Sequence, residues 1–155
     1  MTTKIRPAVV LDTPALKEII DSNGLFPSEM LPDMMHQYLT VLDSKEFWFV
    51  AEHKQTPVGI AYCAPERLTD GTYNLYLIAI HKSQHGLGIG SEMMAHVERF
   101  LKAMGQRILL VETSGLDEYA LTRKFYANLN YKHEATIRDY YKDNEDKIVF
   151  WKRLM

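Results

Sequence analysis

The order of hydrophobic and polar residues along the chain predicts eleven elements. Apolar residues recur every three to four positions, as on one face of a helix, in the segments 12–23, 28–42, 89–104 and 117–129. Short apolar or alternating runs bounded by turn residues predict strands. These lie near 4–6, 47–52, 58–63, 75–80, 108–112, 131–140 and 148–154. The resulting order is β-α-α-β-β-β-α-β-α-β-β.

Residues at the segment ends support these assignments. The first helix has Asp12 or Thr13 as N-cap and Pro14 in its first turn, and Gly24 follows its last residue. Gly105 ends the third helix in the same way. Strands interleaved with helices predict an α/β (α+β) fold, a mixed sheet with helices on its faces. No linker or repeat divides the sequence, so we expect one domain over residues 1–155.

Composition narrows the class of protein. The 155 residues, 46% hydrophobic and 25% charged, are ordinary for a soluble globular domain. A net charge of −2 argues against nonspecific nucleic-acid binding, which needs a basic surface. No run approaches the ~20 apolar residues of a membrane span, and no signal peptide is evident. Cys63 is the single cysteine, which fits a reducing compartment and a cytoplasmic location. With scattered histidines and no His-Glu-x-x-His motif, we expect no metal site.

The segment 84–91, Gln-His-Gly-Leu-Gly-Ile-Gly-Ser, carries the clearest chemistry. It follows the apolar strand 75–80 and opens a helix. Gly86, Gly88 and Gly90 remove side chains and allow positive φ, while unpaired amides at the helix start favour an anion. Packing alone is the alternative explanation of these glycines. The segment lacks the Gly-Lys-Ser/Thr of a Walker loop. The mainly antiparallel strands before it argue against a dinucleotide fingerprint.

Two segments resemble the GNAT acyltransferases. Residues 75–94 are similar to that family's acetyl-CoA motif, (Gln/Arg)-x-x-Gly-x-(Gly/Ala) after a buried strand. Gly88 and Gly90 match its last two fixed positions, and His85 stands at the Gln/Arg position. Residues 121–131 resemble the family's later helix, which usually ends in Phe-Tyr-x-x-x-Gly-Phe/Tyr. Asn130 replaces that glycine, and asparagine is the next best residue for a left-handed cap.

The resemblance implies a GNAT-like domain with a mixed, mainly antiparallel seven-stranded sheet, about four helices, and acetyl-CoA as cosubstrate without a metal. It also implies that main-chain groups of Ile78 and Ile80, with Ala79 between them, pair with the pantetheine amides. The pyrophosphate is then held by the turn, that is by His85, Gly86, Leu87, Gly88, Ile89, Gly90 and Ser91.

Tyr126 is the residue that the resemblance assigns as the acid protonating the leaving CoA thiolate. A phenol beside a thiolate has suitable chemistry for this step. Helical spacing places Tyr126 on a stripe with Tyr119 that could line a cleft, beside a core stripe of Leu121, Phe125 and Leu129. Without the resemblance, Tyr126 would be interpreted as an ordinary tyrosine at the edge of the core.

The acceptor amine must lose a proton. Some GNAT proteins use a glutamate on the strand before the turn, but that position is Asn74 here. Glu112, at the end of its strand, is the best substitute as base, and a surface or ion-paired Glu112 is an equal alternative. Tyr73 and Asp139 are weaker candidates.

The sequence thus predicts an acetyl-CoA-dependent N-acetyltransferase that uses direct attack in a ternary complex on a small-molecule or peptide amine. A noncatalytic acyl-CoA-binding regulatory module is the main alternative, and a nucleotide-binding regulator is a third. Tyr140 and Tyr141, near the chain's end, could bind the acceptor, pair two copies in a homodimer or face solvent.

Overall fold

The computed structural model describes residues 3–155, which form seven strands and four α-helices. The strands are β1 (Thr3–Pro7), β2 (Phe47–His53), β3 (Thr56–Pro65), β4 (Thr72–Ile80), β5 (Ile108–Ser114), β6 (Lys132–Lys142) and β7 (Glu145–Arg153). The helices are α1 (Thr13–Asn23), α2 (Leu31–Thr40), α3 (Ile89–Ala103) and α4 (Ala120–Asn128). The predicted order of elements is confirmed.

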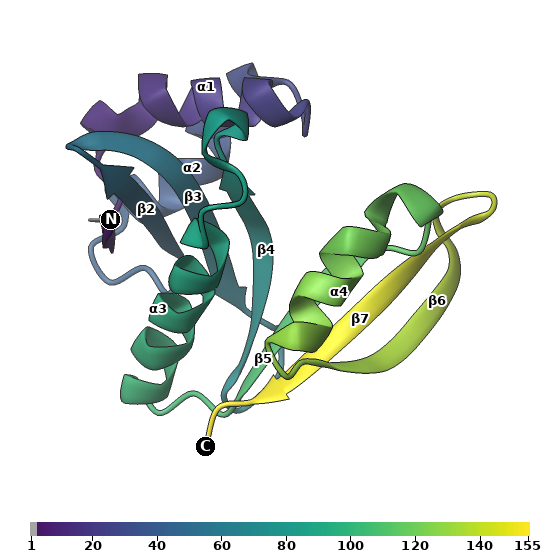
Figure 1. The fold of residues 1–155 in the computed structure, drawn as a ribbon. Coiled ribbons are helices and arrows are strands. Elements are labelled where there is room, and N and C mark those ends of the chain that lie inside the picture. The colour runs from purple at the N-terminus through teal and green to yellow at the C-terminus, as the bar shows by residue number, and fades with distance from the viewer. Residues whose placement is uncertain (1–2) are drawn as a thin grey trace. The chain divides into compact units, whose positions relative to one another are not determined.

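The strands form one mixed sheet in the order β1-β2-β3-β4-β5-β7-β6 (Figure 1). β1 with β2, β2 with β3, β5 with β7 and β6 with β7 are antiparallel, whereas β4 and β5 are parallel. A parallel pair needs a long crossover connection, and α3 supplies it. The mainly antiparallel sheet with four helices agrees with the expected fold.

Residue contacts divide the chain into two compact units. Unit 1 runs to Ala64 and includes Tyr76–Arg99, and unit 2 comprises Pro65–Leu75 and Phe100–Met155. β4 therefore contributes its first half to unit 2 and its second half to unit 1.

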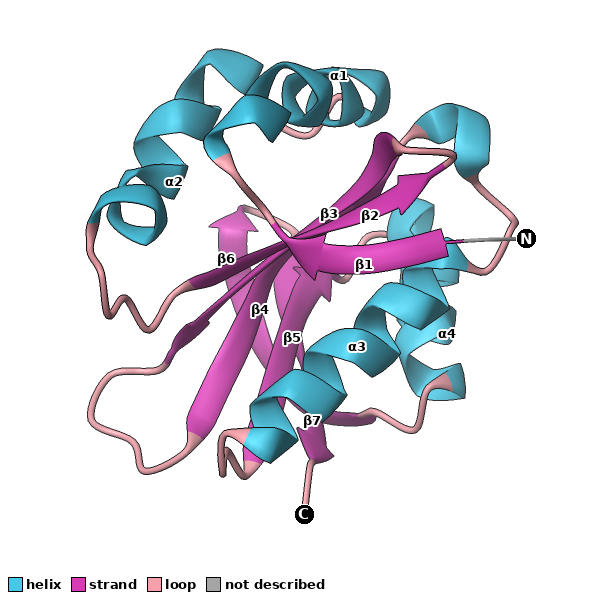
Figure 2. Cartoon of the chain, turned by 90° about the vertical axis from the view of Figure 1, so that its left-hand side faces the viewer, coloured by secondary structure: helices cyan, strands magenta, loops and turns pink. Residues whose placement is uncertain are grey.

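The core of unit 1 lies between α1, α2 and the strands. Leu16, Ile19 and Ile20 of α1 are fully buried, as their helical spacing predicts. They share a cluster with Trp48 and Val50 of β2. Each such aliphatic side chain contributes roughly 1.5–3 kcal/mol by leaving water. Figure 2 shows α1 and α2 on the same side of β2 and β3.

Because side chains point alternately to the two faces of a strand, β2 also packs against α3. Phe49, between Trp48 and Val50, points to the opposite face, and its ring lies 5.1 Å from that of His96 on α3. Met93 and Val97 of α3 are fully buried. α3 is thus packed through a buried hydrophobic face, and this packing fixes the direction of its N-terminus.

Unit 2 is built on β5, β7 and β6, with α4 alongside β6 and β7 in Figure 1. Tyr126 of α4 is buried, and its ring centroid lies 5.6 Å from that of Phe150 and 5.9 Å from that of Tyr131. The prediction that Leu121 belongs to the core was wrong, because it is 82% exposed. Leu121 lies in the first turn of α4, whereas Phe125 and Leu129 of the same stripe are half-buried and Tyr126 is the buried residue of the helix.

Some element ends differ from the prediction. The second helical segment is a 3-10 turn (Ser28–Met30) followed by α2. Asp12 does not cap α1 with its side chain. Its carboxylate instead accepts hydrogen bonds from the Arg6 guanidinium and the Val9 amide. A charged partner binds a carboxylate more strongly than a neutral amide does, so the ion pair prevails.

Candidate functional site

The glycine turn joins β4 to α3 in unit 1. Gly86 and Gly88 both have φ of +80°, the left-handed conformation that glycine adopts without strain. The Gly88 carbonyl accepts the first helical hydrogen bond, from the Glu92 amide at 3.1 Å, so Gly88 is the N-cap of α3. The predicted positive φ is therefore confirmed at two of the three glycines. Gly90 already lies inside α3, and its φ is not positive.

The turn is open to solvent. A side chain carbon added at Gly86 or Gly88 would meet no atom within 4 Å. Leu87 is 49% exposed, whereas Ile89 is 1% exposed and anchors the helix start. Helical geometry leaves the first amides of α3 without an intrahelical acceptor, and the helix dipole adds positive potential there. The turn therefore offers main-chain donors to an anion such as a phosphate.

His85 turns back toward β4 instead of outward. Its Nε2 lies 2.8 Å from the Ile80 carbonyl oxygen, and the Asn23 side-chain amide donates to the same oxygen at 2.9 Å. The Lys82 amide donates to Ser22 Oγ at 3.2 Å. We call Ser22 and Asn23 the α1 clasp, because together they tie the end of α1 to the turn. Sequence reasoning missed this role, since polar residues near a helix end normally serve only that helix.

The predicted pantetheine residues lie at the end of β4. Ala79 is buried, and Ile78 and Ile80 are half-buried. Because the Ile80 carbonyl already accepts two hydrogen bonds, both of its lone pairs are engaged.

Tyr126 is 4% exposed within unit 2. Burial raises the pKa of its phenol above the ordinary value. At neutral pH the hydroxyl therefore keeps its proton and can act as a donor. Asn130, at the end of α4, has φ of +71°, which confirms the left-handed cap expected there.

Glu112 lies near the end of β5, in a network that also belongs to unit 2. Its Oε2 accepts from Asn74 Nδ2 at 2.9 Å and lies 3.2 Å from Lys147 Nζ. Asn74 Nδ2 also donates to Glu66 Oε1 at 3.0 Å. Lys147 Nζ stands 3.9 Å from the centre of the Tyr140 ring. Glu112 is thus ion-paired with Lys147, which was one of the two interpretations of this residue from the sequence.

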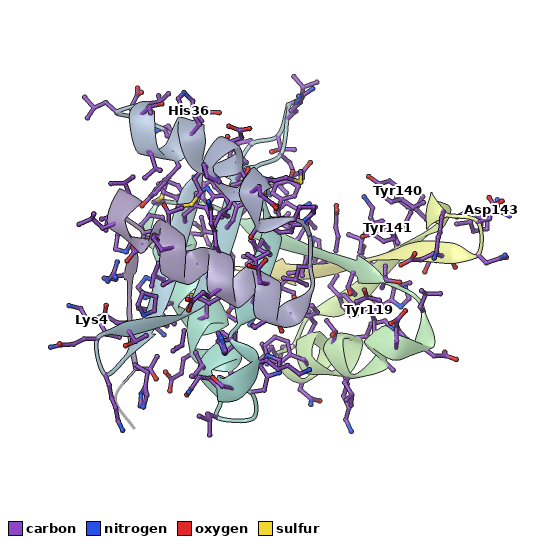
Figure 3. All side chains as sticks on the ribbon, turned by 90° about the horizontal axis from the view of Figure 1, so that it is seen from above. Lys4, His36, Tyr119, Tyr140, Tyr141 and Asp143 are labelled. Carbon is purple, nitrogen blue, oxygen red and sulfur yellow. The ribbon has the colours of Figure 1, made fainter. Side chains whose placement is uncertain are left out.

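Sequence reasoning did not identify Lys147. Lys147 lies on the same face of β7 as Val149, the register partner of Glu112, but this register is known only from the structure. Burial, followed by the charge of Glu112, raises the pKa of the neighbouring Tyr141. Tyr140 and Tyr141 lie side by side at the β6–β7 hairpin (Figure 3). Their ring centroids are 5.1 Å apart.

The weaker candidates have other contacts. Tyr73 is only 2% exposed. Asp139 accepts a hydrogen bond from the Asn144 amide within the hairpin. Arg123 of α4 donates hydrogen bonds to the carbonyls of Ser114 and Leu116 at 2.7 and 2.8 Å.

Two further properties concern residues 3–155 only. None of their helices is long and apolar enough to cross a membrane. No three of their His, Cys, Asp or Glu side chains group as metal ligands would.

Known proteins resemble this chain in sequence and fold. A model of the acetyltransferase (GNAT) family matches residues 14–131. An uncharacterized N-acetyltransferase of Methanocaldococcus jannaschii is 28% identical over 86 residues, which are 54% of this chain and 53% of that protein. The chain therefore spans about half the length of this curated relative.

Solved structures extend the similarity to nearly the whole chain. A GNAT-family protein from Desulfovibrio desulfuricans is 27% identical with a TM-score of 0.90, over 99% of this chain and 100% of that one. An aminoglycoside 6'-N-acetyltransferase complexed with coenzyme A is 15% identical with a TM-score of 0.79, over 98% and 97% of the two chains. The latter similarity concerns the fold.

Proposed function

This chain belongs to the GNAT family of acetyltransferases, and on that premise we propose that it moves the acetyl group of acetyl-CoA to a primary amine by direct attack. The observation that carries the proposal is the exposed glycine turn. Two left-handed glycines leave room at the N-terminus of α3, where unpaired amides favour a pyrophosphate.

The cofactor is assigned to unit 1. His85, Gly86, Leu87, Gly88, Ile89, Gly90 and Ser91 form the proposed pyrophosphate site. Main-chain groups of Ile78, Ala79 and Ile80 are the proposed partners of pantetheine. The Ile80 amide serves better than its carbonyl, which Asn23 and His85 already occupy. The coenzyme A bound to the aminoglycoside acetyltransferase of the same fold supports this choice of cofactor.

The chemical roles are assigned to unit 2. The amine nitrogen attacks the thioester carbonyl, forming a C–N bond, and the C–S bond then breaks. Glu112 takes the proton that the nitrogen loses, and Tyr126 donates its proton to the departing thiolate. The buried, protonated Tyr126 supports the second assignment.

A covalent acetyl-enzyme is disfavoured at the one cysteine of the sequence. Cys63 is fully buried, and burial raises the pKa of its thiol to about 12. A thiol rather than a thiolate is a poor nucleophile. Its free, buried state also suits the reducing cytoplasm, which we propose as the location.

The proposed acceptor is a small-molecule or peptide amine that binds beside Glu112. Tyr140 and Tyr141 are 54% and 44% exposed, and Glu112 is close enough to Tyr141 to affect its pKa. Exposed aromatic rings near a carboxylate suit an ammonium group.

The test is thiol release from acetyl-CoA across a panel of polyamines, amino acids, aminoglycosides and peptides with free N-termini. We expect release with at least one amine class, and mass spectrometry of the product should show one added acetyl group. In parallel, acetyl-CoA should raise the melting temperature, whereas ATP and NAD should not.

Tight CoA binding without turnover for any amine would instead support the noncatalytic acyl-CoA-binding module. Stabilisation by ATP or NAD in preference to CoA would support the nucleotide-binding regulator.

A further inference from the structure

Glu112 is held through one of its two carboxylate oxygens. Asn74 Nδ2, 2.9 Å away, and Lys147 Nζ, 3.2 Å away, both contact Oε2. The hydrogen bond from Asn74 and the closest approach of Lys147 thus fall on the same oxygen. The carboxylate therefore has one engaged oxygen and one, Oε1, that can take a new partner.

The two groups that hold Glu112 are themselves immobilised. Asn74 is fully buried, and Lys147 is 8% exposed. The Lys147 ammonium also lies 3.9 Å from the centre of the Tyr140 ring, at the distance of a cation–π contact. A buried lysine fixed by an aromatic ring and a carboxylate loses the freedom that an exposed lysine keeps. Glu112 consequently has a fixed partner instead of a mobile counter-ion.

The orientation of the Asn74 amide is fixed by charge. Its Nδ2 donates to Glu66 at 3.0 Å as well as to Glu112, so the two carboxylates lie within about 6 Å of each other. Rotating the amide by half a turn would place its oxygen against both of them. In the observed orientation Oδ1 is buried and has no hydrogen-bond partner among residues 3–155.

That unpaired oxygen is costly. A buried acceptor without a donor destabilises a fold, and an aliphatic side chain of the same size would remove the penalty. Packing therefore gives no reason for an asparagine at this position. The hydrogen bond to Glu112 does explain the asparagine, because departures from good packing concentrate at functional sites.

We propose that Asn74 and Lys147 are positioning residues, which fix Glu112 through Oε2 so that Oε1 receives the proton of the acceptor amine. This inference rests on the proposed function. The nitrogen loses its proton to Oε1 as the C–N bond forms, and the C–S electrons leave with the thiolate, which Tyr126 protonates. Lys147 and Asn74 keep their own protons throughout.

The test uses Lys147→Met, Lys147→Arg and Asn74→Leu with an amine that the wild-type protein acetylates. We expect kcat to fall ~10- to 100-fold in Lys147→Met and Asn74→Leu, the size of effect that a misplaced catalytic group produces. Lys147→Arg should recover part of the loss, because arginine restores a cation at Oε2. The Kd of acetyl-CoA should stay within about twofold of the wild-type value in all three, since the glycine turn is untouched.

Lys152→Met is the matched control. Lys152 lies on the same strand and also contacts an aromatic ring, with Nζ 5.2 Å from the centre of Tyr131, but its hydrogen bond goes to the Leu129 carbonyl. Its removal should leave kcat within about twofold of wild type. Melting temperatures measured alongside identify any variant that fails to fold.

Wild-type kcat in folded Lys147→Met would overturn the inference, even if Asn74→Leu did not fold. Glu112→Gln separates this outcome from failure of the proposed function. Loss of activity in Glu112→Gln with full activity in Lys147→Met would remove the positioning role alone. Full activity in Glu112→Gln would remove Glu112 as the base, and the positioning role with it.

Discussion

Burial affects the Tyr126 phenol in two opposed ways. It keeps the hydroxyl protonated at neutral pH, as a proton donor requires, and it also makes the proton harder to release. A developing thiolate next to the hydroxyl would offset the second effect, because hydrogen bonds to charged acceptors strengthen away from water. The same ring contacts Phe150 and Tyr131, so its position is set by packing.

Removing only the hydroxyl of Tyr126 tests its proposed role. We expect Tyr126→Phe to lower kcat by ~10²–10⁴. The Kd of acetyl-CoA should change little, because the ring still fills its place. Steady-state kinetics and calorimetry measure the two quantities. Tyr131→Phe, a change in the neighbouring buried ring, is the control and should keep its activity. An unchanged kcat in Tyr126→Phe would exclude the acid role.

The stability of unit 1 depends on pH through the carboxyl group of Asp12. Two hydrogen bonds of 2.8 Å from the Arg6 guanidinium lower the pKa of its carboxyl in the folded state. The folded pKa lies below the unfolded value of about 3.9, so ionised Asp12 stabilises the fold above that pH. This stability is lost as the pH falls through the folded pKa.

Asp12→Asn should therefore lower the free energy of unfolding by about 2 kcal/mol at pH 7. The difference from wild type should shrink below about pH 4. Urea unfolding between pH 3 and 7 measures it. Asp143→Asn, in the exposed β6–β7 turn, is the control and should change stability by less than ~0.5 kcal/mol. A difference that stays constant down to pH 3 would contradict the ion-pair explanation.

At the scale of elements, the connection between β4 and α3 depends on a backbone that side chains disfavour. Gly88 and Gly105 have φ of +80° and +84°, and a carbon added at either meets no atom within 4 Å. The two positions have the same backbone requirement, but only Gly88 lies in the proposed phosphate site. They form a matched pair.

Gly88→Ala and Gly105→Ala should each cost roughly 1–2 kcal/mol of stability, the penalty of a left-handed alanine. Gly88→Ala alone should also raise the Kd of acetyl-CoA by ~10-fold or more, about 1.4 kcal/mol in binding. Urea unfolding and calorimetry measure the two effects. Equal cofactor affinity in both variants would argue that the turn does not bind the pyrophosphate.

Local patterns predicted the elements better than their ends. Spacing identified the buried face of α1, and Gly24 marked its end with φ of +61°. The exposure of Leu121 and the burial of Tyr126 on α4 were not predictable in this way. Both stripes have helical spacing, and the aromatic partners that bury Tyr126 come from β7 and the segment before β6.

At the scale of the whole molecule, the glycine turn was predictable because it is continuous in sequence and needs unusual residues. The Glu112 network was predictable only in part. Asn74, Glu112 and Lys147 come from three strands, and their meeting depends on the register of β4 with β5 and of β5 with β7. Sequence spacing within any one strand does not contain that register.

The α1 clasp limits how this protein can be redesigned. Ser22 and Asn23 belong to α1 by sequence, yet their side chains support the turn proposed to hold the cofactor. A chimera that imports the first two helices of another GNAT protein to change acceptor preference would exchange this support too. Such grafts should keep Ser22 and Asn23 as part of the cofactor module, so the natural cut between interchangeable parts lies before the last turn of α1.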